Sequence, residues 1–557
     1  MQDSHTLEQL GKRALEWEAY DAWITENPDQ HLFACFHGEV LLPEHVITAI
    51  FAYMGHNRST LNSFSCSQEL YFALLRRWKR LVVTETNWML IPTLVLYATS
   101  QLVFSNSTAG LDRICDELPQ GRQLTLLRFQ GVWIDSVKAE KIATLLPSLC
   151  ALVSLEINNA MLGDTEMEKI SAVLHECPAL TWLDFGVNAF GLVGSTALAA
   201  AILRIPSLNA LNVCHNNIGA QGTAMITDAL LHCRGLTALN FGAIVLGDAG
   251  EEKLSAVISQ SFELEHLELW NNHFGAIAIS KIVSALSRCS ELDSLDFYAS
   301  NIGDDGAEGL ASALKNCPKL FSLNLSQNQI RSAGAAAIST TIAHLRELYW
   351  LDLSRNPIGN VGATAIAGAI KHCHKLSALV INGTEIGDSG AESFADALVF
   401  CPKLTHLDIR YNSISANGIE KIANALTHLR ELRVFDPARN EIGNVGAEKI
   451  AAALVNCPKL TKLYLDSCGI TDGGAVKIAG VLPHLHNLTV LDLNNNEIND
   501  VGFIEIVTAL EFHRTPLRIH VVLHSVGRGG LNKLDEKLKN NPNVTCKSRN
   551  HARRNYY

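Results

Sequence analysis

The stretch that decides the fold is LYWLDLSRNPIGNVGATAIAGAIKHCHK, residues 348–375 of a chain of 557 residues. Leu351 and Leu353 alternate with residues of other kinds, and this period of two is typical of a short strand. Asn356 and Gly359 indicate a turn, because an asparagine amide can satisfy turning backbone and glycine permits a tight bend. Apolar residues then return at helical spacing: Ala363, Ile366, Ala367 and Ile370. The stretch therefore predicts a strand, a turn and a helix.

The same pattern, L-x-x-L-x-L-x-x-N-x-I, returns every 28 residues along most of the chain. Leu124 begins a degenerate first unit, and Pro516 marks a closing unit with the sequence PLRIHVVL. Between them the pattern begins at Leu152, Leu180, Leu208, Leu236, Leu264, Leu292, Leu320, Leu348, Leu376, Leu404, Leu432, Leu460 and Leu488. Fourteen units without an insertion predict one solenoid in which each unit packs on its neighbours. Because helices are wider than strands, the stack should curve with the strands inside.

This pattern resembles the leucine-rich repeat, specifically the long-repeat, ribonuclease-inhibitor-like class, over residues Leu124 to Leu523. The resemblance implies an α/β fold: a horseshoe-shaped solenoid with a parallel sheet on its inner face. Five units lack the usual asparagine, and their turns are expected to be looser: Ala160, Ile244, Ser300, Thr384 and Cys468 take its place.

Composition narrows the class of protein and of partner. The chain is 48% apolar and 18% charged, which is typical of a folded, soluble protein. Its net charge of −11 argues against nucleic acid as the main partner and is compatible with a basic protein partner. The N-terminus has no basic-then-apolar signal pattern, so the 14 cysteines are expected to be free thiols in a reducing, cytoplasmic compartment.

The chain divides into five predicted parts. They are an N-terminal helical segment (1–40), an F-box-like helical region (41–82), a connector and N-terminal cap (83–123), the repeat array (124–523), and a C-terminal cap with a basic tail (524–557). The uncharged run from Asn87 to Leu111 has the length of a membrane span, but polar residues and Pro92 interrupt it. We predict a buried helical segment that covers the end of the array, and no membrane span.

No catalytic constellation stands out, and we expect neither an enzyme nor a cofactor. The chain has no G-x-x-x-x-G-K-[ST], H-E-x-x-H or paired C-x-x-C motif. His372 and His374 flank Cys373, but no fourth metal ligand is evident at that helix end. Seven cysteines share one register position, where small buried apolar side chains are a better explanation than metal ligands: Cys177, Cys233, Cys289, Cys317, Cys373, Cys401 and Cys457.

The predicted inner face carries the candidate target-binding site. The strand position between the second and third leucines holds eight acidic residues among thirteen: Glu156, Asp184, Asn212, Asn240, Glu268, Asp296, Asn324, Asp352, Val380, Asp408, Asp436, Tyr464 and Asp492. Flanking positions add Trp182, Trp270, Tyr298, Trp350, Arg410 and Tyr411. Aromatic side chains and arginine dominate binding energy at protein interfaces. The pattern favours a protein target with a basic surface, although such aspartates are also common in solvated strands of this repeat.

In front of the array, LPEHVITAIFAYM (Leu42–Met54) predicts one amphipathic helix that proline leads in. Two further apolar helical stripes run through Leu61, Phe64, Leu70, Leu74, Trp78 and Leu81. The whole region resembles an F-box through Leu42-Pro43-Glu44, Val46-Ile47, Ile50-Phe51, Tyr53-Met54 and Trp78-Lys79-Arg80-Leu81. It departs from the family at Phe64-Ser65-Cys66-Ser67, which lacks the basic residue and the aromatic that usually follow. The resemblance implies that a Skp-type adaptor of a cullin ubiquitin ligase binds Leu42, Pro43, Val46, Ile50 and Phe51.

Three functions stay open on the sequence alone. The first is a substrate receptor of a ubiquitin ligase, either eukaryotic or a eukaryote-like effector that an intracellular bacterium delivers into the host cytoplasm. The second is a stand-alone scaffold or inhibitor whose front helices only cap the first repeat. The third, GTPase activation, fits less well, because relatives with that activity carry an acidic tail and the tail here, VTCKSRNHARRNYY, is basic.

Overall fold

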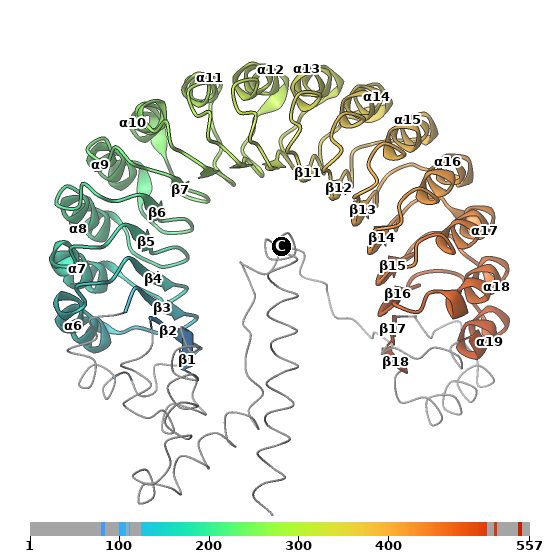
Figure 1. Cartoon of the computed structure of the whole chain (residues 1–557), viewed down its shortest axis with the longest axis horizontal. Coiled ribbons are helices and arrows are strands. Elements are labelled where there is room, and N and C mark those ends of the chain that lie inside the picture. Colours follow the sequence, from blue (N-terminus) through green and yellow to red (C-terminus); the bar gives the residue numbers. More distant parts are fainter. Residues whose placement is uncertain are drawn as a thin grey trace, which may run out of the picture.

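The computed structural model describes residues 80–83, 100–106, 111, 124–509, 517–520 and 544–547. These residues form a horseshoe in which the strands line the inner rim and the helices form the outer rim (Figure 1). The predicted solenoid with its strands inside is confirmed.

Eighteen described strands form one parallel sheet, in which each strand pairs with the next along the chain. They are β1 (Arg80–Val83), β2 (Gln101–Ser105), β3 (Leu126–Gln130), β4 (Ser154–Asn158), β5 (Trp182–Asp184), β6 (Ala210–Asn212), β7 (Ala238–Asn240), β8 (His266–Glu268), β9 (Ser294–Asp296), β10 (Ser322–Asn324), β11 (Trp350–Asp352), β12 (Ala378–Val380), β13 (His406–Asp408), β14 (Val434–Asp436), β15 (Lys462–Tyr464), β16 (Val490–Asp492), β17 (Leu517–His520) and β18 (Val544–Lys547).

One helix follows each strand from β3 to β16. The helices are α6 (Ser136–Leu145), α7 (Asp164–Val173), α8 (Leu192–Ile202), α9 (Gly219–Leu230), α10 (Gly247–Gln260), α11 (Ala276–Leu286), α12 (Gly303–Leu314), α13 (Ser332–Ile342), α14 (Gly359–Ile370), α15 (Asp388–Leu398), α16 (Ala416–Leu426), α17 (Gly443–Leu454), α18 (Asp472–Val481) and α19 (Asp500–Ala509). Short 3-10 turns extend three of them: η3 (Leu146–Ser148), η4 (Leu174–Glu176) and η5 (Leu482–His484).

The register of the sheet follows the sequence period. Leu323, Leu351 and Leu379 lie side by side in adjacent strands, each 28 residues from the last. Strands β3 to β16 are the fourteen predicted units. The core fills the space between sheet and helices: in the unit that begins at Leu348, the strand leucines and the helix isoleucines are at most 3% exposed. One apolar core therefore runs the length of the array.

Buried asparagines join each unit to the one before it. The Asn356 amide nitrogen donates to the carbonyls of Leu325 at 2.8 Å and Leu353 at 3.0 Å. Its amide oxygen accepts from the backbone N–H groups of Asn328 at 2.9 Å and Ile330 at 3.0 Å. The side chain thus satisfies buried backbone groups that the turn would leave unpaired.

Three of the five replacements recover part of this bonding. The Ser300 hydroxyl donates to the carbonyl of Leu269 at 2.9 Å, and the Thr384 hydroxyl donates to that of Ile381 at 2.7 Å. The Cys468 thiol lies 3.5 Å from the carbonyl of Asp466. Ala160 and Ile244 have no side-chain donor, yet their backbone N–H groups reach the asparagine of the next unit. The register holds at all five positions.

A second set of polar contacts joins neighbouring units at the starts of the helices. The first-turn Asp or Asn of one helix accepts backbone N–H groups from the start of the next helix. Asp304 accepts from Arg331 and Gly334 at 2.8 and 2.9 Å, and Asn360 accepts from Gly387 and Gly390 at 2.8 and 3.0 Å. Each helix is therefore capped by the preceding unit.

The sheet extends beyond the predicted array at both ends. The helix predicted for residues 87–111 is wrong at Gln101–Ser105, which is strand β2. The third helical stripe of the F-box-like region is wrong at Arg80 and Leu81, which belong to β1. The closing unit is confirmed by β17, and β18 adds a strand within the segment expected to be cap and tail. The predicted adaptor residues Leu42, Pro43, Val46, Ile50 and Phe51 lie outside the described residues.

We predict that Asn356→Ala destabilises the array by about 3 kcal/mol or more, because it leaves several buried backbone groups without partners. Asn356→Ser should cost less, since Ser300 occupies the same position in another unit and recovers a donor. Urea unfolding followed by circular dichroism measures both changes. Asn316→Ala removes an exposed amide as a control and should shift the free energy by under about 0.5 kcal/mol. Equal costs for Asn356→Ala and the control would contradict the role of the asparagine.

Candidate protein-binding face

The inner face of the horseshoe presents two side chains from each three-residue strand. In β5 and β11 the middle leucine is buried, whereas the residues on either side of it face the hollow of the horseshoe. These outward positions hold Trp182 and Asp184 in β5, and Trp350 and Asp352 in β11. The inner face is therefore a regular surface on which residue type, not backbone shape, sets what can bind.

The predicted aromatic anchors lie along this face and are spread over most of its length. Trp182 is 41% exposed and Tyr411 is 47% exposed. The other aromatic candidates are half-buried: Trp270, Tyr298, Trp350 and Tyr464. The Arg439 guanidinium lies 4.6 Å from the centre of the Tyr411 ring. The predicted residues thus share a face without converging on one point, except at its C-terminal part.

The aspartates of the stripe serve the turns of their own units. Asp184 accepts the N–H of Gly186 at 2.8 Å, Asp296 that of Tyr298 at 2.7 Å, and Asp352 that of Ser354 at 2.9 Å. The same bond joins Asn212 to Cys214 and Asn240 to Gly242. Since the bond needs only an acceptor oxygen, Asp and Asn interchange at this position.

Burial changes the electrostatic meaning of the stripe. Glu156, Asp408, Asp436 and Asp492 are at most 9% exposed, and Asp184, Glu268, Asp296 and Asp352 are half-buried. Desolvation raises the pKa of Asp296 and of Asp352 to about 6. The structure therefore corrects the sequence-based view of solvated carboxylates: much of the acidic stripe is withdrawn from the surface.

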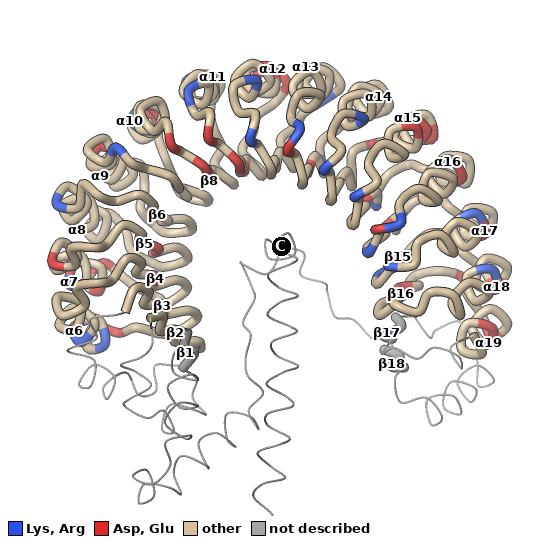
Figure 2. The backbone as a smooth tube through the Cα atoms, viewed as in Figure 1, with Lys and Arg blue, Asp and Glu red and all other residues tan. Residues whose placement is uncertain are grey.

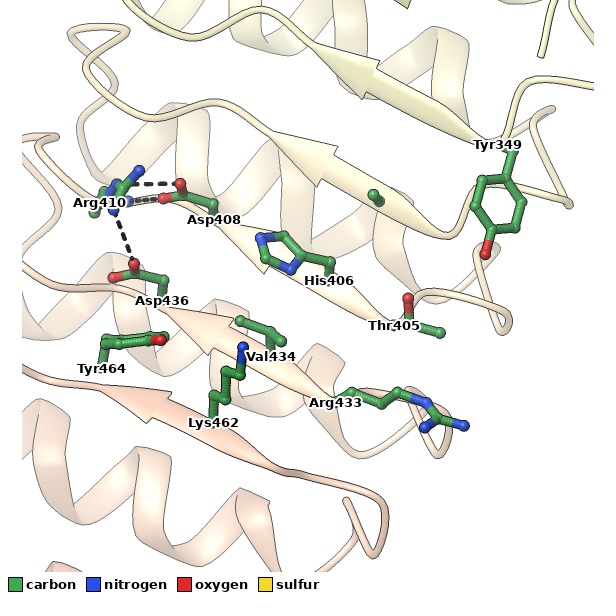
Figure 3. Close-up of a pocket in the computed structure, with 11 residues that line it drawn as sticks. Tyr349, Thr405, His406, Asp408, Arg410, Arg433, Val434, Asp436, Lys462 and Tyr464 are labelled. Carbon is green, nitrogen blue, oxygen red and sulfur yellow. Dashed lines mark hydrogen bonds and ion pairs between the residues drawn. The ribbon is translucent and has the colours of Figure 1, made fainter. Parts of the chain in front are cut away.

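The C-terminal part of the face brings several predicted residues together. Arg410 Nε lies 3.1 Å from Asp408 Oδ2, and Arg410 Nη1 lies 3.4 Å from Asp436 Oδ2, as Figure 3 shows. The Asn382 amide also donates to Asp408 at 3.0 Å. Burial raises the pKa of both aspartates, and the Arg410 charge opposes that rise.

Beside this network the face is hollowed to a volume of about 600 Å³ (Figure 3). We call it the C-terminal hollow, and its lining is Tyr349, Ala378, Thr405, His406, Asp408, Arg410, Arg433, Val434, Asp436, Lys462 and Tyr464. The sequence analysis found Asp408, Arg410, Asp436 and Tyr464 and missed the rest. The missed residues stand at the first position of a strand or just before it. A register table of those positions would have shown the basic residues Arg433 and Lys462 one unit apart.

The seven register cysteines are buried, as predicted. Their thiols lie against backbone carbonyls of the preceding unit, for example Cys373 at 3.3 Å from the carbonyl oxygen of Ile342. Burial raises the pKa of the Cys373 and Cys401 thiols to about 12, so both are protonated at neutral pH. These cysteines therefore pack as small apolar side chains in the core.

Two searches returned nothing within the described part of the chain. It contains no group of three or more His, Cys, Asp or Glu side chains placed to hold a metal ion. None of its helices combines the length and the apolar character that crossing a membrane requires.

The raised pKa of Asp352 makes a pH-dependent prediction. Its folded-state pKa of about 6 lies above the usual 3.8, so the folded protein binds the proton more tightly and loses stability as the pH rises between these values. We expect Asp352→Asn to stabilise the protein by about 1 kcal/mol at pH 7.5, because the amide keeps the acceptor oxygen without the buried charge. The gain should vanish near pH 4. Urea unfolding at both pH values measures it, and an equal gain at both would contradict the assigned cause.

Comparison with known proteins bears on the repeats. No curated protein matches the chain significantly. Among solved structures, an internalin from Listeria monocytogenes str. 4b F2365 is similar with a TM-score of 0.44 and 20% identity, over 67% of this chain and 87% of that one. The family model described as "Leucine Rich repeat" matches residues 316–339, 344–367, 372–395, 400–423, 425–451, 456–479 and 484–507. No enzyme family is indicated. These matches, in the same register as the units that precede them, identify the chain as a leucine-rich repeat protein.

Proposed function

We propose that this leucine-rich repeat protein is a non-enzymatic substrate receptor. Its inner face holds a target protein, and its F-box-like region, residues 41–82, docks a Skp-type adaptor and so a cullin ubiquitin ligase. The observation that carries the proposal is a rigid inner sheet with aromatic side chains along it, preceded in the chain by the Leu42–Met54 motif. The place of action is the cytoplasm, which is the host cytoplasm if the chain is a bacterial effector.

The aromatic side chains are suited to anchor a protein. Trp182 is exposed on β5, so a partner would bury apolar surface that now meets water. Trp270 packs flat on Gly242, where an added Cβ would lie 2.2 Å from the indole. A ring already held in place loses little side-chain entropy when a partner binds.

Charge supports a basic target surface along β5 to β11. Asp184, Glu268, Asp296 and Asp352 are half-buried there and lie near the tryptophans of the same strands. Their carboxylates would strengthen binding to lysine or arginine, because a cation nearby lowers a raised pKa and favours the charged form. The proposal therefore assigns the basic part of the target to this stretch of the face.

The ligase part of the proposal is supported by the sequence alone. Leu42, Pro43, Val46, Ile50 and Phe51 match the residues with which an F-box contacts its adaptor. The combination of such a motif with a target-binding solenoid has a direct use: one end selects a protein, and the other brings it to the enzyme that modifies it.

The alternative is a stand-alone scaffold or inhibitor of the ribonuclease-inhibitor-like class. Helices of 10 to 14 residues in every unit favour this long-repeat class. In this alternative the front helices only cover the apolar end of the array, as terminal caps do in solenoids. GTPase activation stays the least favoured function, because no acidic tail follows the repeats.

We predict that Leu42→Ala/Pro43→Ala in the full chain abolishes binding to a purified Skp-type adaptor, because both side chains belong to the proposed contact. Leu10→Ala/Leu15→Ala outside the motif serves as the control and should leave binding unchanged. Isothermal titration calorimetry measures the affinity, and thermal unfolding reports on the array. Unchanged adaptor binding in the first variant would remove the F-box from the proposal. Loss of folding in that variant would favour the cap.

A second prediction concerns the target. Trp182→Ala should weaken binding of a target purified on the wild-type chain by about 2 kcal/mol, or roughly 30-fold in Kd, if this indole is an anchor. Trp133→Ala is a matched control, because Trp133 is 69% exposed and stands in the loop before α6 instead of on the inner face. Surface plasmon resonance measures both. A greater loss for the Trp133 variant would move the binding site off the inner face.

A further inference from the structure

The C-terminal hollow differs in charge from the rest of the inner face. Its lining holds three cations, Arg410, Arg433 and Lys462, against two carboxylates, Asp408 and Asp436. Both carboxylates are buried and contact Arg410. Lys462 is exposed and Arg433 is half-buried, so the charge that a partner would meet here is positive.

Lysines on the outer rim show what the hollow lacks. Along the helices, lysine regularly pairs with glutamate of the preceding unit: Lys421 with Glu392 at 2.8 Å, Lys449 with Glu420 at 2.6 Å, and Lys477 with Glu448 at 2.9 Å. Within residues 124–509, no carboxylate forms an ion pair with Arg433 or Lys462. Two cations one unit apart on a concave surface therefore stand ready for external anions.

The hollow also offers apolar contact between its charges. Val434 and Ala378 lie toward its middle, and Tyr349 and Arg433 lie toward one side (Figure 3). The Tyr349 ring stacks on Phe321 with centroids 4.6 Å apart, so the tyrosine is held in place at the rim. A side chain that enters here would meet apolar and aromatic surface with cations on either side of it.

We infer that the C-terminal hollow binds an acidic segment of the protein partner, with Asp or Glu side chains on Arg433 and Lys462 and an apolar residue between them over Val434. The inference rests on the proposed role of the inner face in protein binding. It reverses, for β12 to β15, the basic partner surface expected from the sequence. The target would then carry a basic region opposite β5 to β11 and an acidic segment opposite the hollow.

A peptide fits these observations better than nucleic acid does. The carboxylates of Asp408 and Asp436 lie next to Arg410, so a dense row of phosphates would meet negative charge close by. The whole chain carries a net charge of −11, which repels a long polyanion beyond the hollow. A short segment with two or three carboxylates and an apolar side chain matches both the charge and the volume of about 600 Å³.

His406 on the floor of the hollow gives a local reporter. Burial, with the charges of Lys462 and Arg410, lowers its pKa to about 4. A bound carboxylate would stabilise the imidazolium form and raise this pKa.

The test uses immobilised acetylated pentapeptides with the full-length protein. One series has the form Glu-X-Glu-X-Glu, the other Lys-X-Lys-X-Lys, with Leu, Phe or Val at X. We expect the wild type to retain the acidic series more strongly, and Arg433→Glu/Lys462→Glu to lose at least tenfold of that binding. Lys315→Glu/Lys403→Glu changes the net charge equally at exposed positions outside the hollow and should bind as the wild type does.

NMR titration of the labelled His406 imidazole with the best acidic peptide supplies the second readout. A rise in its pKa with bound peptide supports the site. No rise, or equal loss of binding in the two charge variants, overturns it. If the basic series binds better and Arg433→Glu/Lys462→Glu strengthens it, the inner face still binds protein and only the acidic segment is wrong. If neither series binds and Trp182→Ala leaves target binding intact, the proposed inner-face site falls as well.

Discussion

A side-chain amide buried between two units is the interaction on which the rest of the structure depends. Where each strand turns toward its helix, backbone N–H and C=O groups leave the ladder inside an apolar core, and an unpaired group there costs free energy. Asn356 pairs with two carbonyls and two N–H groups, three of the four in the preceding unit. An insertion between strand and asparagine would break this bonding in two units at once. The constant 28-residue spacing from Leu124 to Leu488 is the sequence record of that requirement.

The same geometry decides which residues are left for binding. With strands of three residues, one side chain goes to the core and two face inward. One of these two positions is largely used by the turn, as the bonds of Asp352 to Ser354 and of Asn240 to Gly242 show. Acidic residues at that position therefore report on local backbone needs before they report on a partner. The chemistry available to a partner comes mostly from the neighbouring positions, where Trp182, Trp350 and Lys462 stand.

The success of the sequence analysis followed the strength of the period. All fourteen registered strands were predictable, because leucines at fixed spacing can bury only one way. Strand β2 was missed because it pairs with β3 at an offset of 25 residues, from Gln101 to Leu126, and not 28. Its signal was present: Leu102 and Phe104 are buried, and Phe104 stacks on Phe129 at 4.7 Å. The aromatic positions on the inner face were predictable from register. The basic character of the C-terminal hollow was not, since it depends on which carboxylates are buried against Arg410.

The two kinds of contact between units point in opposite directions along the chain. The turn asparagine of a unit satisfies the unit before it, whereas the first-turn Asp or Asn of a helix, such as Asp304 or Asn360, caps the unit after it. A segment of one full period therefore carries half of the interface on each side, and any copy joins any other without new residues. Gene duplication or unequal recombination could lengthen or shorten such an array by whole periods while every joint stayed satisfied. The size of the opening, and so the size of protein it can admit, can then change in evolution without redesign of the fold.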